Sequence, residues 1–133
     1  MELKDYFENT KGVGVLATAD SDGKVDAAIY AKPHVMADGT IAFIMRDRLT
    51  HKNITANPHA VYLFIENAGG YKGVRLFLKK VREDDDAELI KQMTRRCLTA
   101  EEDAAKGPKF LVYFAVEKIL NLIGGDSPDI SLG

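Results

Sequence analysis

The stretch IAFIMRDRLTHKNITANP, residues 41–58, predicts a strand, a charged turn and a short helix in direct succession. Five consecutive apolar residues, Ile41 to Met45, predict a buried strand, since two of them are β-branched. The next residues predict the first turn of a helix, which Asn57-Pro58 must end because proline cannot continue it. A polar turn is thus held between two regular elements.

The turn after this strand carries positive charge. Three basic residues and one acidic residue give it a local charge of 3 minus 1, or plus 2, in a chain whose net charge is -2. Backbone N–H groups at a helix start, a hydroxyl and guanidinium groups together suit a phosphate. An ordinary solvated turn is the alternative, and spacing alone favours it, because charged turns are common and this one lacks the glycines of stronger phosphate loops. The residues concerned are Arg46, Asp47, Arg48, Thr50, His51 and Lys52.

Length and composition indicate one globular domain over residues 1–133. With 46% hydrophobic and 29% charged residues, the chain can form one core and is too short for two ordinary domains. No basic tract is present, which argues against nucleic-acid binding. The first ten residues lack the apolar core of a signal peptide and no later run approaches a membrane span, so we expect a cytoplasmic protein. The single cysteine, Cys97, cannot form an internal disulfide, in agreement with a reducing compartment.

Most of the chain is predicted to form strands. The pairs Asp22-Gly23 and Asp38-Gly39 are hairpin signals, because both positions tolerate positive φ, so the first three strands should form an antiparallel meander. Closure of a meander on itself removes its exposed edges. We therefore expect a mainly β fold, a six-stranded antiparallel barrel with short helices. The predicted strands are residues 12–19, 25–36, 41–45, 60–66, 73–82 and 109–123.

Two further segments have the pattern of amphipathic helices. One is near the N-terminus, where Leu3 and Phe7 share a face. The other follows the fifth strand, with acidic residues 83–88 at its start and basic residues 91–96 towards its end, as the helix dipole favours. Cys97 falls on the apolar face of this helix, which predicts a structural role for the thiol. Residues 99–108 are predicted to be a polar connection, and residues 124–133 a loose tail.

The order of these elements resembles that of the pyridoxamine 5'-phosphate oxidase-like flavoproteins. The most specific part is RDRLTHKNITANPHAVYLF, residues 46–64, where this family has a basic or hydroxyl-bearing turn, an Asn-hydrophobic pair and Asn-Pro before a strand. The resemblance covers nearly the whole chain. It implies a split β-barrel of the FMN-binding type and a homodimer with one FMN in each of two clefts at the subunit interface.

The resemblance also implies which residues hold the phosphate of FMN. The family's phosphate-binding turn falls on Arg46, Arg48, Thr50 and His51, with Lys52 beside the same helix start. Arg46 and Arg48 can pair with the phosphate, and Thr50 can both cap the helix and donate its hydroxyl. The chain departs from the family where a lysine is usual, because Thr50 occupies that position, so Arg48 or Lys52 must supply the charge.

The family lines the flavin ring with the middle of the second strand, here residues 28–32. Backbone groups there can bond the polar edge of the ring, with Ala31 among them. Tyr30 can pack against the ring, and Lys32 can face the phosphate or the N1/O2 edge, where a cation favours the reduced anionic flavin. The alternative, a barrel tyrosine and a solvated lysine, stays open, since alternation does not tell which face is inward.

Other kinds of site have little support in the sequence. His34 and His59 have no Cys, Asp or Glu partners at metal-ligand spacing, so no metal site is expected and both should lie at the surface or at a strand edge. A nucleophile elbow and a Walker-type loop are both missing, which argues against hydrolase chemistry. No catalytic residue can be assigned.

Three classes of function remain open. The first is an FMN-dependent oxidoreductase that passes electrons between flavin and a small substrate or NAD(P)H. The second is an FMN-binding protein for electron transfer or storage, and the third is a non-flavin split barrel that binds heme or serves as an interaction module. True pyridoxamine phosphate oxidase activity is not expected, because the chain lacks the family's C-terminal Arg-x-His pair.

Overall fold

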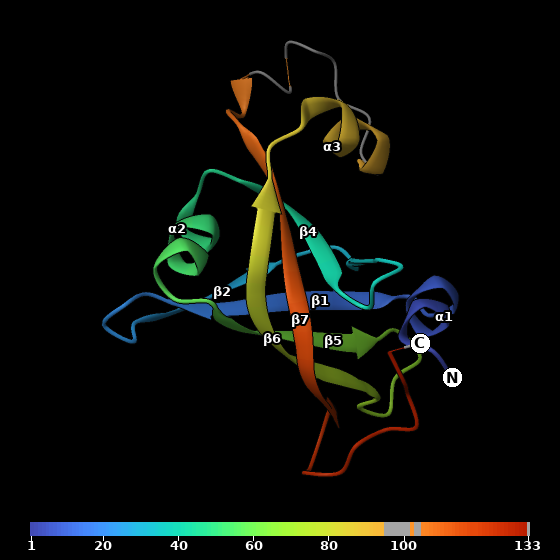
Figure 1. Cartoon of the computed structure of the whole chain (residues 1–133). Coiled ribbons are helices and arrows are strands. Elements are labelled where there is room, and N and C mark those ends of the chain that lie inside the picture. The colour runs from blue at the N-terminus through green and yellow to red at the C-terminus, as the bar shows by residue number, and fades with distance from the viewer. Residues whose placement is uncertain (95–101, 103–104, 133) are drawn as a thin grey trace.

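A computed structural model describes residues 1–94, 102 and 105–132 of the chain. Within these residues an antiparallel sheet of seven strands carries short helices at its margins (Figure 1). The strands are β1 (Gly12–Ala19), β2 (Val25–Ile29), β3 (His34–Val35), β4 (Ile41–Arg46), β5 (His59–Glu66), β6 (Gly73–Asp84) and β7 (Lys109–Asn121). The helices are α1 (Leu3–Asn9), α2 (Leu49–Ala56) and α3 (Ala87–Met93). The strand order is β2-β1-β5-β6-β7-β4-β3.

The predicted mainly β fold with short helices is confirmed, but the described sheet has seven strands instead of six. The predicted strand over residues 25–36 is two strands, β2 and β3, which lie at opposite edges of the sheet. Between them lies Pro33, which has no N–H to donate to a ladder and so favours a break. The sheet is therefore not closed by hydrogen bonds, and a continuous barrel is not seen.

The predicted meander of the first three strands is wrong for the same reason. Both Asp-Gly turns do form hairpins, with Gly23 at φ 82° between β1 and β2 and Gly39 at φ 87° between β3 and β4. However, β2 pairs with β1 and does not pair with β4, whose long-range partner is β7. The chain crosses from one sheet edge to the other between Ile29 and His34, and this crossing forms one wall of the site described below.

The core lies on the inner face of the curved sheet, where α1 packs against it. Side chains alternate between the two faces along each strand, so β1 and β5 each bury every second residue on this inner face. Edge-to-face and tilted aromatic pairs fill its centre, with ring centroids between 5.0 and 6.2 Å apart. The aromatic residues of these pairs are Phe7, Phe43, Tyr62, Phe64 and Phe114.

The third helix begins later than its acidic sequence predicts. β6 continues to Asp84, and α3 begins after Asp86, whose side chain accepts hydrogen bonds from the N–H groups of Glu88 and Leu89. The acidic run predicts a first helical turn, yet its first two residues, Glu83 and Asp84, belong to β6 and pair with β7. Cys97, predicted to lie on this helix, is outside the described residues.

The described part of the C-terminal tail returns to the N-terminus. The N–H of Leu3 donates to the carbonyl of Ser131 at 2.7 Å, and the N–H of Ser131 donates to Met1 at 2.9 Å. Figure 1 shows the two chain ends close together beside α1. None of the helices in the described ranges is long and apolar enough to cross a membrane.

Candidate functional site

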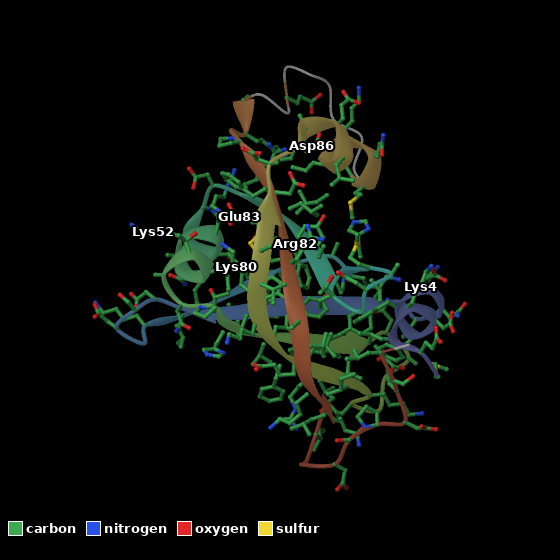
Figure 2. The ribbon with its side chains drawn as sticks, in the orientation of Figure 1. Lys4, Lys52, Lys80, Arg82, Glu83 and Asp86 are labelled. Carbon is green, nitrogen blue, oxygen red and sulfur yellow. The ribbon has the colours of Figure 1, made fainter. Side chains whose placement is uncertain are left out.

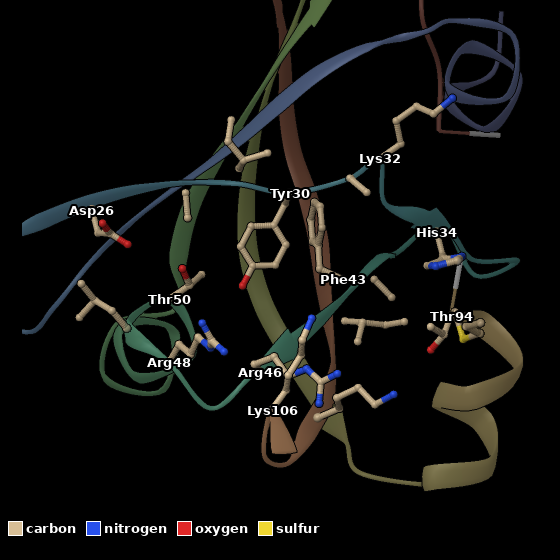
Figure 3. A pocket seen from close by; sticks show the side chains of 18 residues that line it. Asp26, Tyr30, Lys32, His34, Phe43, Arg46, Arg48, Thr50, Thr94 and Lys106 are labelled. Atoms are coloured by element: carbon tan, nitrogen blue, oxygen red, sulfur yellow. The ribbon is translucent and has the colours of Figure 1, made fainter. Parts of the chain in front are cut away.

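A cavity of about 630 Å³ lies where the β2–β3 crossing, β4 and the start of α2 face the junction of α3 and β7 (Figure 3). This volume is within the range of about 300–1,000 Å³ that small-molecule sites occupy. Its walls combine basic, aromatic and small apolar side chains. The lining residues are Asp26, Ala28, Ile29, Tyr30, Ala31, Lys32, His34, Ala42, Phe43, Ile44, Arg46, Arg48, Leu49, Thr50, Met93, Thr94, Lys106 and Lys109.

The start of α2 gives the cavity an anion-binding side. Arg48 is the N-cap residue and its side chain makes no capping hydrogen bond, so the first N–H groups of the helix have no side-chain cap. Thr50 lies two residues inside the helix and is 4% exposed, which corrects the prediction that it caps α2. Arg48, Leu49 and Thr50 all line the cavity, so the uncapped helix start, a hydroxyl and a guanidinium group lie along one side of it, an arrangement that suits a phosphate.

Tyr30 joins the anion-binding side to the apolar wall. Its hydroxyl is hydrogen-bonded to Thr50, and its ring meets Phe43 edge to face with centroids 5.9 Å apart. Burial raises the pKa of Tyr30, as does the charge of Asp26, whereas the Thr50 hydrogen bond and the charge of Arg48 act in the opposite direction. The net shift is upward, so the phenol is neutral and can donate or accept a hydrogen bond.

Ala31 and Lys32 also line the cavity, but the ammonium group of Lys32 is directed elsewhere. Its Nζ donates to the carbonyl oxygens of Phe7 at 2.6 Å and Thr10 at 3.0 Å, at the C-terminal end of α1. Figure 3 shows the side chain turned towards that helix and away from Tyr30. A cation is stabilised there by the helix dipole. Lys32 thus ties the strand crossing to α1.

His51 and Lys52 do not line the cavity, although both follow Thr50 directly. The ring of His51 stacks on Phe110 with centroids 4.0 Å apart and planes 3° apart. Its Nε2 lies 3.1 Å from both carboxylate oxygens of Glu83, and its Nδ1 lies 3.5 Å from Asp47. Lys52 is exposed on the outer side of α2 (Figure 2). Because successive helical residues point about 100° apart, one helix start cannot direct all of these side chains into the same cavity.

Several lining residues were not identified from the sequence. His34 lies on the edge strand β3, in agreement with the expected strand edge, but the sequence did not show that it also lines the cavity. Lys106 and Lys109 come from the far end of the chain, and their only signal is a second basic turn, KGPK, before an apolar strand. They lie near Arg46 because β4 pairs with β7, and the local sequence does not predict this pairing.

Comparison with solved structures shows the same fold in other proteins. An FMN-binding protein from Syntrophomonas wolfei has 17% identity and a TM-score of 0.72, covering 92% of this chain and 85% of that one. An F420 reductase has 21% identity and a TM-score of 0.65, covering 90% and 97%. HutZ, the heme storage protein from Vibrio cholerae, has 19% identity and a TM-score of 0.62, covering 91% and 95%. At these identities the likeness concerns the fold alone.

The assignment of the chain to a family rests on a match over most of its sequence. Comparison with the curated proteins gives no significant match. The family model described as pyridoxamine 5'-phosphate oxidase matches residues 2–122, which include every strand and helix named above and all the residues of the cavity. The chain therefore belongs to the pyridoxamine 5'-phosphate oxidase family.

Proposed function

We propose that the chain binds FMN in this cavity and acts as an oxidoreductase between the flavin and a small substrate or reduced nicotinamide. The observation that carries the proposal is the meeting of Arg48, Thr50 and the N-terminus of α2 at one side of a cavity with an aromatic wall. FMN, when bound, supplies hydride and electron transfer, which none of the side chains in the cavity can supply.

The residues present suit the parts of FMN. Arg48, the hydroxyl of Thr50 and the first N–H groups of α2 would hold the phosphate. β2 is an edge strand, paired with β1 on one side only, so its other side has backbone groups that can bond the polar edge of the ring. Tyr30, held by Thr50 and packed on Phe43, supplies an aromatic surface and excludes water from the inner wall.

We also propose that the site is completed by a second copy of the chain. Ile29 and Leu49 line the cavity yet are 70% and 54% exposed, and Val25 on the same edge strand is 82% exposed. Apolar side chains at the rim of a site are a typical surface for a partner subunit. A homodimer would bury them and close the cavity.

The phosphate assignment is tested by replacing Arg48 and Thr50 together with alanine. We expect FMN affinity to fall about tenfold to a hundredfold, since charged hydrogen bonds to the phosphate are removed. Affinity for riboflavin, which has no phosphate, should change much less. Both affinities can be measured by quenching of flavin fluorescence, with Lys4→Ala on α1 as control and circular dichroism as a check on folding. Equal losses for FMN and riboflavin would place the phosphate elsewhere.

The absorption spectrum of the purified protein tests the cofactor itself. A flavin spectrum, with FMN released on denaturation, is expected, and colourless protein that takes up no added FMN would exclude flavin function. Stopped-flow reduction by NADH or NADPH then separates an oxidoreductase from an electron carrier, because a carrier should react slowly with both.

Heme is the second candidate, and one observation favours it. His34 and Tyr30 both line the cavity, and histidine and tyrosine are the side chains that hold heme iron in several protein classes. A Soret band in place of the flavin spectrum, lost on replacement of His34 by alanine, would support heme binding over FMN.

A further inference from the structure

The imidazole ring of His51 lies between two carboxylates that come from different parts of the chain. Its Nε2 is 3.1 Å from both carboxylate oxygens of Glu83 on β6, and its Nδ1 is 3.5 Å from the carboxylate of Asp47, in the turn that joins β4 to α2. The ring is stacked on Phe110 of β7 and the residue is 9% exposed, so it has little freedom to turn away. Asp47, His51 and Glu83, here called the His51 link, therefore connect α2 and the turn before it to the sheet.

The number of protons on the ring decides how many of these contacts can be hydrogen bonds. A neutral imidazole has one N–H group, so it can donate to Glu83 or to Asp47, whereas the imidazolium ion can donate to both. The shorter distance is that to Glu83, which agrees with a neutral ring that donates from Nε2. Imidazole is the side chain that changes its charge between about pH 5 and 8. Proton uptake by His51 would therefore complete the link to Asp47 with a charge-assisted hydrogen bond.

The charges around the ring favour its protonated form. On β6, the Nζ of Lys80 lies 2.7 Å from the carboxylate of Glu83. β7 places the uncharged Phe110 against the ring, while Lys109, the preceding residue of that strand, lines the cavity. On α2, Lys52 is exposed on the outer side (Figure 2). Two carboxylates thus face the ring with one ammonium group beside them, and a proton on the ring balances these charges.

The His51 link is joined directly to the anion-binding side of the cavity. Asp47 precedes Arg48, the N-cap residue of α2, and Thr50 precedes His51. Arg48 and Thr50 both line the cavity, and Figure 3 shows them beside Tyr30, to which Thr50 is hydrogen-bonded. A cation in the first turn of a helix is unfavourable, and an anion bound at the helix start offsets this effect. Protonation of His51 and binding of a phosphate should therefore favour each other, with equal coupling in both directions.

Given the proposed FMN site, we propose that His51 is a proton-dependent positioning residue for the phosphate. In its imidazolium form it bonds Glu83 and Asp47 at once, fixes the turn that carries Arg48, and adds positive charge behind the helix start. The phosphate is then bound more tightly as the pH falls from about 8 to about 5.5. Its release at higher pH accompanies the loss of a proton from the ring.

The test compares FMN affinity across this pH range in the unmodified protein and in His51→Gln, at constant ionic strength. The phosphate of FMN itself takes up a proton near about pH 6, so the ratio of the two affinities is compared at each pH. We expect this ratio to rise about fivefold to tenfold from the highest to the lowest pH, and to stay constant for riboflavin, which has no phosphate. His59→Gln is the matched control, since His59 is an exposed histidine 3.9 Å from Glu117 and outside the cavity.

Asp47→Ala separates this role from a purely structural one. The side chain of Asp47 is 63% exposed, so its replacement should leave the stacking on Phe110 and the bond to Glu83 intact. We expect FMN affinity at the highest pH not to fall, and the extra gain in acid to disappear. Equal pH dependence in the unmodified protein and His51→Gln would overturn the inference, as would a gain that persists in Asp47→Ala or an equal gain for riboflavin.

Sulfate distinguishes failure of this inference from failure of the proposed function, because its charge does not change over the same pH range. It is titrated by calorimetry into flavin-free protein. FMN binding without a pH effect of His51 would overturn the inference and leave the proposed function standing. Protein that takes up no FMN would refute the proposed function. Sulfate binding that tightens in acid in that protein, and not in His51→Gln, would still support the role of His51, whereas no sulfate binding would overturn that role as well.

Discussion

Gly14 on β1 allows Tyr62 of β5 to reach the wall of the cavity. A Cβ at position 14 would overlap the hydroxyl end of Tyr62. That hydroxyl donates to the carbonyl oxygen of Tyr30 at 3.0 Å, and the N–H of Tyr30 donates to Gly14 at the same distance. Because Gly14 has no side chain, the Tyr62 hydroxyl can bond to the backbone of Tyr30 and hold it in place at the site.

Replacing Gly14 with alanine should therefore displace Tyr62 and disturb the site. We expect a loss of about 1–3 kcal/mol in the free energy of unfolding, typical of an overpacked core, together with weaker FMN binding. Urea unfolding and fluorescence titration measure the two effects. Gly125→Ala is the matched control, since a Cβ there meets nothing within 4 Å. Equal behaviour of the two variants would contradict the role assigned to Gly14.

At the scale of elements, α2 is held in place by polar contacts on the side away from the cavity. His51 stacks on Phe110 and bonds to Glu83 of β6, while the buried Asn53 donates to Thr18 of β1 at 3.1 Å. Asn53 is the first residue of the Asn-hydrophobic pair noted in the sequence, so that pair fastens the helix to the sheet. These contacts fix where the first turn of α2 presents Arg48 and Thr50.

The link between Glu83 and α2 predicts a loss of stability in acid. Burial acts to raise the pKa of Glu83, but the hydrogen bonds and charges of Lys80 and His51 outweigh it and hold the pKa below its ordinary value of 4.5. A carboxylate with a lowered pKa adds stability above its unfolded-state pKa, and this stability is lost as pH falls through the folded-state value. Figure 2 shows Lys80 and Glu83 on the part of β6 nearest α2.

Glu83→Gln should remove this pH dependence. We expect the variant to be less stable than the unmodified protein by about 1 kcal/mol near neutral pH, with the difference shrinking below about pH 4. Urea unfolding across this range gives the comparison, and Glu8→Gln on the exposed face of α1 serves as control. A difference that stays constant as the pH falls would show that the charge of Glu83 does not act through these contacts.

At the scale of the whole molecule, the cavity depends on segments that are far apart in the sequence. Residues between 26 and 34 supply one wall and residues between 42 and 50 supply a second. The third wall is formed by Met93, Thr94, Lys106 and Lys109. They meet because β7 pairs with both β4 and β6, so the start of β7 lies beside the turn that leads into α2. The open rim of this cavity is where a second copy is proposed.

Val25→Glu tests the proposed dimer without touching the cavity lining. A charge at this 82% exposed position of the edge strand should shift dimer to monomer and lower FMN affinity, since the partner would complete the site. Light scattering gives the mass, and fluorescence titration gives the affinity. Ile123→Glu, at a 64% exposed position outside this cavity, is the control. A monomer that binds FMN tightly in both forms would refute the interface model.

The sequence alone was sufficient for features that depend on neighbouring residues. It predicted the mainly β fold and both Asp-Gly hairpins, because turn chemistry and strand alternation are local properties. For the turn at Arg48 and Thr50 it showed the positive charge, while spacing alone favoured an ordinary solvated turn. The family resemblance added the second-strand residues Tyr30, Ala31 and Lys32, all of which line the cavity.

Only the tertiary structure decided which of these residues face one another. The predicted strand over residues 25–36 is broken into β2 and β3, which lie at opposite edges of the sheet. The ammonium group of Lys32 donates hydrogen bonds to carbonyl oxygens at the end of α1. The side chain of His51 contacts β6, whereas Thr50 lines the cavity. The opposition of Arg46 and Lys109 likewise arises from strand pairing. Long-range pairing and the direction of each side chain depend on the whole core, so the local pattern determines the chemistry available and the fold determines where it is used.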